Sequence, residues 1–157
     1  MGVKVKLTRY NHCVGESNLH LQFTPKYRKP IFEDKDVRDE CEKQFKEIAA
    51  RLNVQLAGIG FGPDHAHAFV TDWKNYSIAN LVQRFKGASS RVIRQKLSVR
   101  LIVKGLYGDS MWSDGYMHRT VGAVTTEIMK KYVNESQKKH WTVHKPIQAQ
   151  TTLLNCN

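Results

Sequence analysis

Residues 54–72 read VQLAGIGFGPDHAHAFVTD, and this stretch decides the fold that we expect. Its first part, Val54 to Phe61, is predicted to be a strand that ends at a Gly-Pro turn. Its second part, Ala66 to Asp72, is predicted to be the next strand. Because side chains alternate between the two faces of a strand, His65 and His67 share one face. The opposite, core-facing side carries Ala66, Ala68 and Val70.

The segments before this stretch have the periodicity of one strand and one helix. Leu19 to Thr24 alternates between apolar and polar residues, as a half-buried strand does. A helix follows, for which Asp34 or Asp36 is available as N-cap. Its apolar residues recur every three or four positions and form one stripe: Val37, Cys41, Phe45, Ile48 and Leu52.

The segments after it predict a second helix, a fourth strand and a last helix. Ser77 is available to cap the second helix, whose apolar positions are Ile78, Leu81, Val82, Phe85, Val92, Ile93 and Leu97. A glycine-rich loop at Lys104 to Asp109 precedes the fourth strand, Trp112 to Val121. The last helix is expected from about Ala123 to Lys139.

The predicted order is β-α-β-β-α-β with a helix appended, which is the split β-α-β, ferredoxin-like pattern. We therefore expect an α+β fold in which helices pack on an antiparallel sheet and a C-terminal helix bears Tyr132. A length of 157 residues is typical of a single domain, 1–157, with a real core. The polar tail, about 141–157, is expected to be loosely held.

The charge balance points to a polyanionic partner. The chain has 25 Lys and Arg against 14 Asp and Glu, a formal charge of +11, and nucleic acid is the commonest polyanion. The alternative is a basic protein without such a partner. Three scattered cysteines (Cys13, Cys41 and Cys156) indicate reduced thiols, and no apolar run approaches the ~20 residues of a membrane span. Without a secretory signal at the N-terminus, we expect a cytoplasmic protein.

The histidine pair is a candidate metal site. Two imidazoles on one face of a strand can converge on one ion, and Asp64 beside them can orient an imidazole. His20, on the polar face of the first strand, can face the same site as an orienting or phosphate contact, or be a structural histidine. Seven histidines in this length also produce an H-x-H pattern by chance in roughly a third of sequences. His118 receives no role.

Two basic clusters are candidate DNA contacts. The second helix carries cationic residues around a run of small residues, which lets a phosphate backbone approach closely. The residues that we assign to DNA there are Arg84, Lys86, Ser89, Ser90, Arg91 and Arg94. Lys26 and Arg28 form the second cluster, with Tyr27 available to stack on a base. The alternative is a solvated helix face.

Tyr132 lies on the apolar stripe of the last helix, where the default interpretation is a core tyrosine with its hydroxyl at the surface. Its basic neighbours, and the oxygen-bearing side chains in the next turn and a half, favour chemistry instead. A phenol with a pKa of about 10 is a poor nucleophile until a base or a cation activates it. A divalent ion held by the histidine pair would supply that activation.

Taken together, these segments resemble the single-tyrosine HUH transposases, the TnpA-type enzymes that move insertion sequences as single-stranded DNA. The matching segments keep the family order: NLHLQFTPKYRKPIF (18–32), GPDHAHAFV (62–70), FKGASSRVIRQ (85–95), MWSDGYMHRTVG (111–122) and IMKKYVNESQ (128–137). The resemblance implies that His65 and His67 bind Mg²⁺ or Mn²⁺ and that Tyr132 attacks the DNA phosphate. It also implies a homodimer in which each tyrosine helix serves the partner's metal site.

The third metal ligand departs from the family pattern. Many members place a glutamine four residues after the tyrosine, where this chain has Ser136. Gln137 follows one residue later, about 140° further around a regular helix than the tyrosine. Gln137 is the candidate ligand if the helix end unwinds, and Glu135 or Ser136 could replace it.

The resemblance implies a DNA transposase that nicks and rejoins single-stranded DNA through a 5′-phosphotyrosine and recognises hairpins at insertion-sequence ends. No nucleotide cofactor is expected, and the chain has no G-x-x-x-x-G-K-[ST] loop. The alternatives are a domesticated relative that nicks hairpins without mobilising an element, and a non-catalytic hairpin-binding protein.

Overall fold

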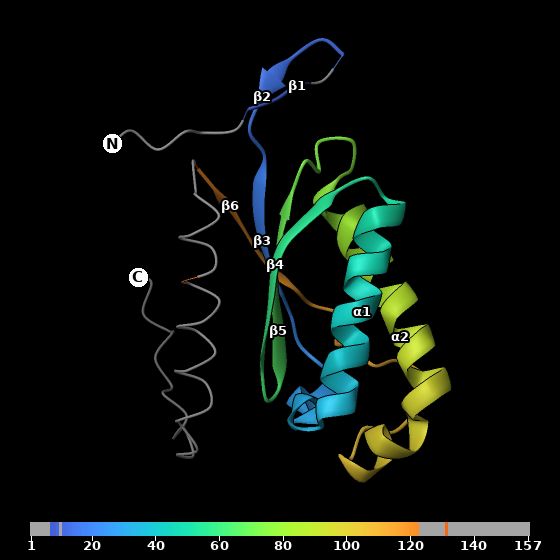
Figure 1. Ribbon diagram of the computed structural model, residues 1–157. Helices are drawn as coiled ribbons and strands as arrows, with labels where there is room; N and C mark the ends of the chain where they lie inside the picture. Colours follow the sequence, from blue (N-terminus) through green and yellow to red (C-terminus); the bar gives the residue numbers. More distant parts are fainter. Residues whose placement is uncertain (1–6, 10, 123–130, 132–157) are drawn as a thin grey trace, which may run out of the picture.

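The computed structural model describes residues 7–9, 11–122 and 131, and the following account concerns these residues. Their central element is a four-stranded antiparallel sheet in the order β4-β5-β3-β6 (Figure 1). Its strands are β3 (Asn18–Phe23), β4 (Gln55–Gly62), β5 (His65–Thr71) and β6 (Met117–Val121). A separate pair, β1 (Thr8–Arg9) and β2 (Val14–Gly15), precedes it.

Two helices, α1 (Lys35–Arg51) and α2 (Ile78–Val103), lie on the same side of the sheet (Figure 1). Short 3₁₀ turns, η1 (Lys26–Arg28) and η2 (Ile31–Glu33), connect β3 to α1. The chain therefore follows the order β3-α1-β4-β5-α2-β6, which confirms the expected split β-α-β, ferredoxin-like fold. No helix within the described residues is long and apolar enough to cross a membrane.

The core lies between the sheet and the two helices. Alternate residues of β3 and β5 face the helices and are fully buried: Leu19, Leu21, Phe23, Ala66, Ala68 and Val70. Phe45 of α1 and Phe85 of α2 pack against Phe23, with ring centroids 5.2 and 6.3 Å from it. The predicted alternation is thus confirmed, and it directs the histidines of β5 to the face away from the helices.

Both helices begin at the expected caps. The Asp34 carboxylate accepts hydrogen bonds from the backbone N–H groups of Asp36 and Val37, at 2.9 and 3.4 Å, so Asp34 is the N-cap of α1. The Ser77 hydroxyl accepts from the N–H of Asn80 at 3.1 Å at the start of α2.

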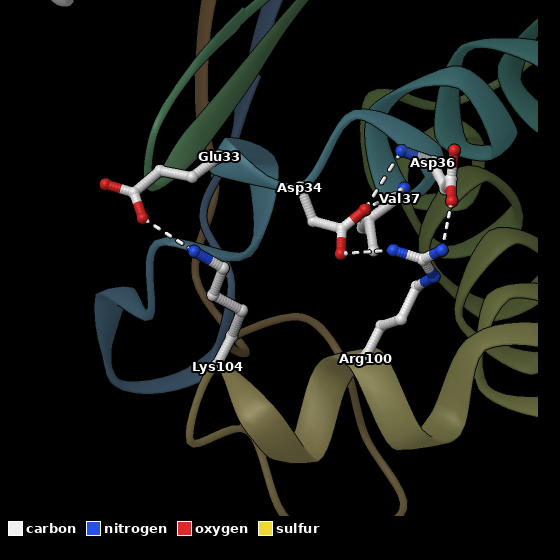
Figure 2. Close-up of polar contacts among 6 residues, drawn as sticks. All are labelled: Glu33, Asp34, Asp36, Val37, Arg100 and Lys104. Atoms are coloured by element: carbon white, nitrogen blue, oxygen red, sulfur yellow. Dashed lines mark hydrogen bonds and ion pairs between the residues drawn. The ribbon is translucent and has the colours of Figure 1, made fainter.

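Ion pairs join the start of α1 to the last turns of α2 (Figure 2). Arg100 donates to Asp34 at 2.9 Å and also pairs with Asp36. Lys104 pairs with Glu33 at 2.8 Å, and about two turns earlier Lys96 pairs with Glu40 at 2.8 Å. Lys96, Arg100 and Lys104 therefore hold the start of α1, and the part of α2 before Lys96 remains a candidate for contact with DNA.

The structure corrects the predicted bounds of three strands. Because a two-residue turn joins β4 and β5, each is shifted by one residue: β4 runs from Gln55 to Gly62 instead of 54–61, and β5 from His65 to Thr71 instead of 66–72. The fourth strand begins at Met117 instead of Trp112, because the Trp112 side chain is buried in the core and its backbone forms an isolated bridge with Pro25. The predicted last helix, with Tyr132 and Gln137, and the predicted tail lie outside the described residues.

Candidate active site and nucleic-acid interface

Three histidines form a row on the sheet face away from the helices. His65 and His67 come from β5, and His20 comes from the neighbouring strand β3. The ring centroids of His65 and His67 are 4.9 Å apart, and those of His67 and His20 are 5.1 Å apart. All three side chains are buried. The predicted pair therefore shares one face, and His20 joins it as the sequence suggested.

An acid and a base hold the His65 end of the row. Asp64 Oδ1 lies 2.7 Å from His65 Nδ1, and Asp64 Oδ2 accepts from the Arg28 guanidinium at 2.8 to 2.9 Å. Partial burial raises the pKa of Asp64, but the hydrogen bond to His65 and the charge of Arg28 outweigh it and lower the pKa. Asp64 is therefore an anion that fixes the orientation of the His65 ring.

A second hydrogen bond holds the other end. His20 Nε2 lies 2.9 Å from His67 Nδ1, and the His20 ring stacks on Phe69 with centroids 4.5 Å apart. Burial, and then the charge of Arg119, lower the pKa of His20 below its usual value. A neutral His20 ring has one donor and one acceptor nitrogen, so it can fix the tautomer of His67.

This arrangement suits metal coordination through the Nε2 atoms. A metal-binding histidine characteristically has its other ring nitrogen hydrogen-bonded to a carboxylate or a similar group, which sets the ring's tautomer and direction. Asp64 and His20 provide that contact at the two Nδ1 atoms. Within residues 7–9, 11–122 and 131, no three or more His, Cys, Asp or Glu side chains form a metal-binding group. The candidate third ligand, Gln137, is not among the described residues.

Gly62 is a residue of this site that the sequence analysis missed. It pairs with His65 across β4 and β5, and a Cβ atom there would lie 2.7 Å from His65 Nε2 and 2.8 Å from Nδ1. The His65 ring thus occupies the space above this glycine. The two-residue Pro63-Asp64 turn could have revealed it, because such a turn places its flanking residues opposite each other.

We expect Gly62→Ala to lower metal affinity by roughly tenfold or more, the scale of disturbing a ligand's orientation. The added methyl group displaces the ring and leaves the backbone register intact. Isothermal titration with Mn²⁺ measures the affinity, and a thermal melt monitors the fold. Gly87→Ala is the control, because a Cβ there meets nothing within 4 Å. Equal Mn²⁺ affinity of wild type and Gly62→Ala would contradict the described ring position.

A basic groove of about 740 Å³ lies between α2 and the segment from Asp109 to Tyr116. Arg91 and Arg94 line it together with Gly87 and Ser90. Arg91 is exposed, whereas Arg94 donates to the carbonyl of Ser110 at 2.8 Å. Arg84 lies about two turns before Arg91 on α2, is exposed, and donates to Asn80 at 2.9 Å.

Two residues assigned to DNA from the sequence have other contacts. The Lys86 ammonium group donates to three backbone carbonyls, of Ser113, Asp114 and Gly115, at 2.7 to 2.9 Å, which uses all three of its donors. Ser89 is fully buried, and its hydroxyl accepts from the Trp112 indole at 2.9 Å. Lys86 and Ser89 therefore hold the segment after α2 in place, and their assignment to DNA stays a prediction. Ser90 is half-buried and accepts from the N–H of Met111.

The second basic cluster lies beside the histidines. Lys26 and Arg28 belong to η1, and Arg28 reaches the site through Asp64. The Arg28 side chain is 66% exposed, so it can contact a phosphate while it holds Asp64. The structure therefore brings the histidines, Asp64 and Arg28 together, and places the basic groove on the helix side of the sheet.

Fold and site define a class: a ferredoxin-like domain with an oriented H-x-H pair on the sheet face away from its helices. Residues 13–136 match the family model described as "Transposase IS200 like", and the chain belongs to this family. It is 27% identical over 126 residues to the ISDra2 transposase TnpA of Deinococcus radiodurans, covering 80% of this chain and 88% of that protein.

Two solved structures share the fold. One, described as a transposase from Deinococcus radiodurans R1, is 22% identical with a TM-score of 0.66, over 83% of this chain and 98% of that one. The other is a REP-associated tyrosine transposase bound to a REP hairpin, 10% identical with a TM-score of 0.58, over 87% of this chain and 76% of that one. At these identities the likeness concerns the fold.

Proposed function

We propose that this member of the transposase family nicks and rejoins single-stranded DNA in a metal-dependent reaction and recognises DNA hairpins at insertion-sequence ends. The observation that carries the proposal is the orientation of the histidine pair. Asp64 holds Nδ1 of His65 and His20 holds Nδ1 of His67, the contacts that characteristically orient metal-binding histidines.

The proposed metal is Mg²⁺ or Mn²⁺, since imidazole with oxygen ligands suits Mn²⁺ at least as well as Mg²⁺. Such an ion polarises a phosphate oxygen and orients the scissile bond when it is bound. His65 and His67 are its proposed ligands, with Gln137 as the third. Arg28 contributes positive charge beside them for the phosphate.

The proposed nucleophile is Tyr132. Its phenolic oxygen loses a proton and forms a bond to phosphorus, while the bond from phosphorus to the 3′ oxygen breaks and that oxygen becomes a 3′ hydroxyl. The 5′ phosphate is then joined to the tyrosine. Attack by the 3′ hydroxyl of a second strand reverses these steps and rejoins the DNA. The covalent link conserves the bond energy, so no nucleotide cofactor is needed.

The proposal is tested with single-stranded DNA from the flanks of the gene, incubated with the chain and Mn²⁺. A protein–DNA adduct that survives denaturation supports the proposal. A chain that binds the DNA hairpins but forms no adduct is a hairpin-binding protein. Adduct formation on repeated hairpins, without imperfect palindromes flanking the gene, identifies a domesticated relative.

The proposed DNA surface includes Arg84, Arg91 and Arg94 of α2, together with Lys26 and Arg28. We expect replacement of the three α2 arginines by alanine to weaken DNA binding and to flatten its salt dependence. Each lost phosphate contact lowers the slope of log K against log salt by about one. Fluorescence anisotropy at several salt concentrations measures this slope.

Arg100→Ala is the control, because it removes one positive charge from the same helix, as each of the three substitutions does. Its guanidinium already binds Asp34 and Asp36 (Figure 2), so the slope should remain that of wild type. A slope that is unchanged in the α2 triple variant would mean that these three arginines do not touch the DNA backbone.

A homodimer with shared sites is part of the proposal, and it rests on the family resemblance. We expect that co-expressing a Tyr132→Phe chain with a His65→Ala chain restores cleavage. In a shared-site heterodimer one site receives intact histidines and an intact tyrosine, so activity returns to roughly half of wild type per dimer. Differently tagged chains allow the heterodimer to be purified and assayed.

Co-expression is needed because a large interface does not readily exchange subunits after folding. Purified heterodimers without cleavage, beside an active wild type, would place Tyr132 next to the histidines of its own chain.

A further inference from the structure

A second groove, of about 370 Å³, lies next to the histidine row and has no assigned role. The turn from Pro25 to Arg28 forms one side, and the segment from Ser113 to Met117 forms the other. Gln22 and Thr24, at the end of β3, also line it. We call it the turn groove. Its size falls within the roughly 300–1,000 Å³ typical of small-molecule sites.

The turn side of this groove is strained and displays an aromatic ring. Tyr27 and Arg28 have φ values of 58° and 51°, in the left-handed region that non-glycine residues avoid. Backbone hydrogen bonds hold the turn, from Lys26 N–H to the carbonyl of Met111 and from Arg28 N–H to that of Pro25, both 3.0 Å. The Tyr27 side chain is 80% exposed. Since the ring adds little packing to the described fold, the strain points to a role in binding.

The opposite side carries a second aromatic ring on a fixed loop. Lys86 binds the carbonyls of Ser113, Asp114 and Gly115, and its ammonium group lies 5.5 Å from the centroid of the Tyr116 ring. The Tyr116 ring is 39% exposed. Lys86, on the far side of the loop, therefore holds a tyrosine at the turn groove.

The groove connects directly to the proposed site of cleavage. Gln22 pairs with His67 across β3 and β5, so it lies beside the histidine row. Arg28 lines the groove and binds Asp64, which holds His65. Whatever occupies the groove thus lies next to the phosphate that these residues would hold.

We propose that the turn groove binds one unpaired nucleotide adjacent to the scissile phosphate. Its base stacks on Tyr27, with Tyr116 on the other side. Gln22 and Ser113 offer hydrogen-bonding groups to the base edge, and Arg28 contacts the backbone phosphate. This proposal rests on the proposed function, and it gives the chain its own means of setting the position of the cut.

The test measures binding by the full chain with Tyr132→Phe, so that the DNA stays intact. The probes are single-stranded oligonucleotides with a hairpin and a flank, in which each flank nucleotide in turn is replaced by an abasic one. We expect one flank position at which loss of the base weakens binding on the order of 5- to 100-fold, the usual contribution of one stacked base. Fluorescence anisotropy gives the dissociation constants.

When Tyr27→Ala is added to the Tyr132→Phe chain, binding of the oligonucleotide without an abasic site should weaken by a similar factor. In this double variant, the abasic site at that flank position should have no further effect. Tyr27→Phe keeps the ring and should bind as the parent does, and Tyr116→Ala should reproduce the loss. Tyr107→Ala is the control, because Tyr107 is 67% exposed but does not line the groove. Unchanged binding by Tyr27→Ala, or equal losses at every abasic position, would overturn the proposal.

The outcomes separate this proposal from the proposed function. Suppose that Tyr27→Ala removes the effect of the abasic site at one flank position, but the wild-type chain forms no adduct with the DNA. This result supports the nucleotide site in the turn groove and rejects the cleavage chemistry. If the wild-type chain forms the adduct but Tyr27 and the flank position have independent effects on binding, the cleavage chemistry is supported and the nucleotide site in the turn groove is rejected. Preference for free mononucleotides over the flank would also reject it.

Discussion

Tyr132→Phe abolishes the covalent protein–DNA adduct and leaves hairpin binding nearly unchanged. This is the expected result because the substitution removes only the hydroxyl oxygen, which is the proposed nucleophile, and retains the ring. A phenylalanine ring has no atom that can form the phosphoester bond, so the loss should be complete. Denaturing gels of labelled single-stranded DNA measure the adduct, and anisotropy measures hairpin binding.

Tyr107→Phe is the matched control, because it removes the same atom from an exposed tyrosine away from the histidine row. It should form adduct as wild type does. An adduct that persists at the wild-type level in Tyr132→Phe would show that Tyr132 is not the nucleophile. Tyr27 and Tyr116, which line the groove beside the histidines, would then be the next residues to replace.

Strand β3 was predictable because it is short and strictly patterned. Leu19, Leu21 and Phe23 alternate with polar residues, and burial of that one face decides which side chains face the helices. The same alternation predicted that His65 and His67 share a face, and the structure confirms it. Local periodicity is enough for such features because no distant residue is needed to decide them.

The roles of individual polar residues were less predictable. Lys86 and Arg91 look alike in sequence, five positions apart on one helix. The Lys86 ammonium group donates hydrogen bonds to the loop after α2, whereas the Arg91 side chain is exposed. The difference comes from a loop more than 20 residues away, whose carbonyls lack strand partners. The sequence identifies the hydrogen-bond donors, but only the structure shows which acceptors they bind.

The contact between Arg28 and Asp64 illustrates the same limit at the candidate site. Arg28 was predicted as a DNA contact in a separate basic cluster, and Asp64 as a residue that orients an imidazole. They lie 36 positions apart, and the fold joins them at 2.8 Å. The resulting chain of contacts, from Arg28 through Asp64 to His65, couples the proposed phosphate contact to the proposed metal ligand.

The histidine pair should be as indispensable as the tyrosine. We expect His65→Ala and His67→Ala each to abolish cleavage, and wild type to require Mn²⁺ or Mg²⁺. Each substitution removes one of the two proposed imidazole ligands. His12→Ala is the matched control, because His12 is exposed and lies before β2, away from the row. Cleavage assays across a metal titration, with hairpin binding as a test of folding, measure the effect.

A graded variant separates loss of the metal from loss of the fold. Asp64→Asn keeps the size of the side chain but removes the charge that faces His65 and Arg28. Changes to such an orienting partner lower metal affinity or activity by roughly 10–100-fold, so Asp64→Asn should need more Mn²⁺ and recover when it is supplied. His65→Ala should not recover at any Mn²⁺ concentration, because the ligand itself is missing. Full cleavage by His65→Ala or His67→Ala in excess EDTA would rule out a metal role for the pair. Equal metal requirements of wild type and Asp64→Asn would mean that the Asp64–His65 contact does not tune the site.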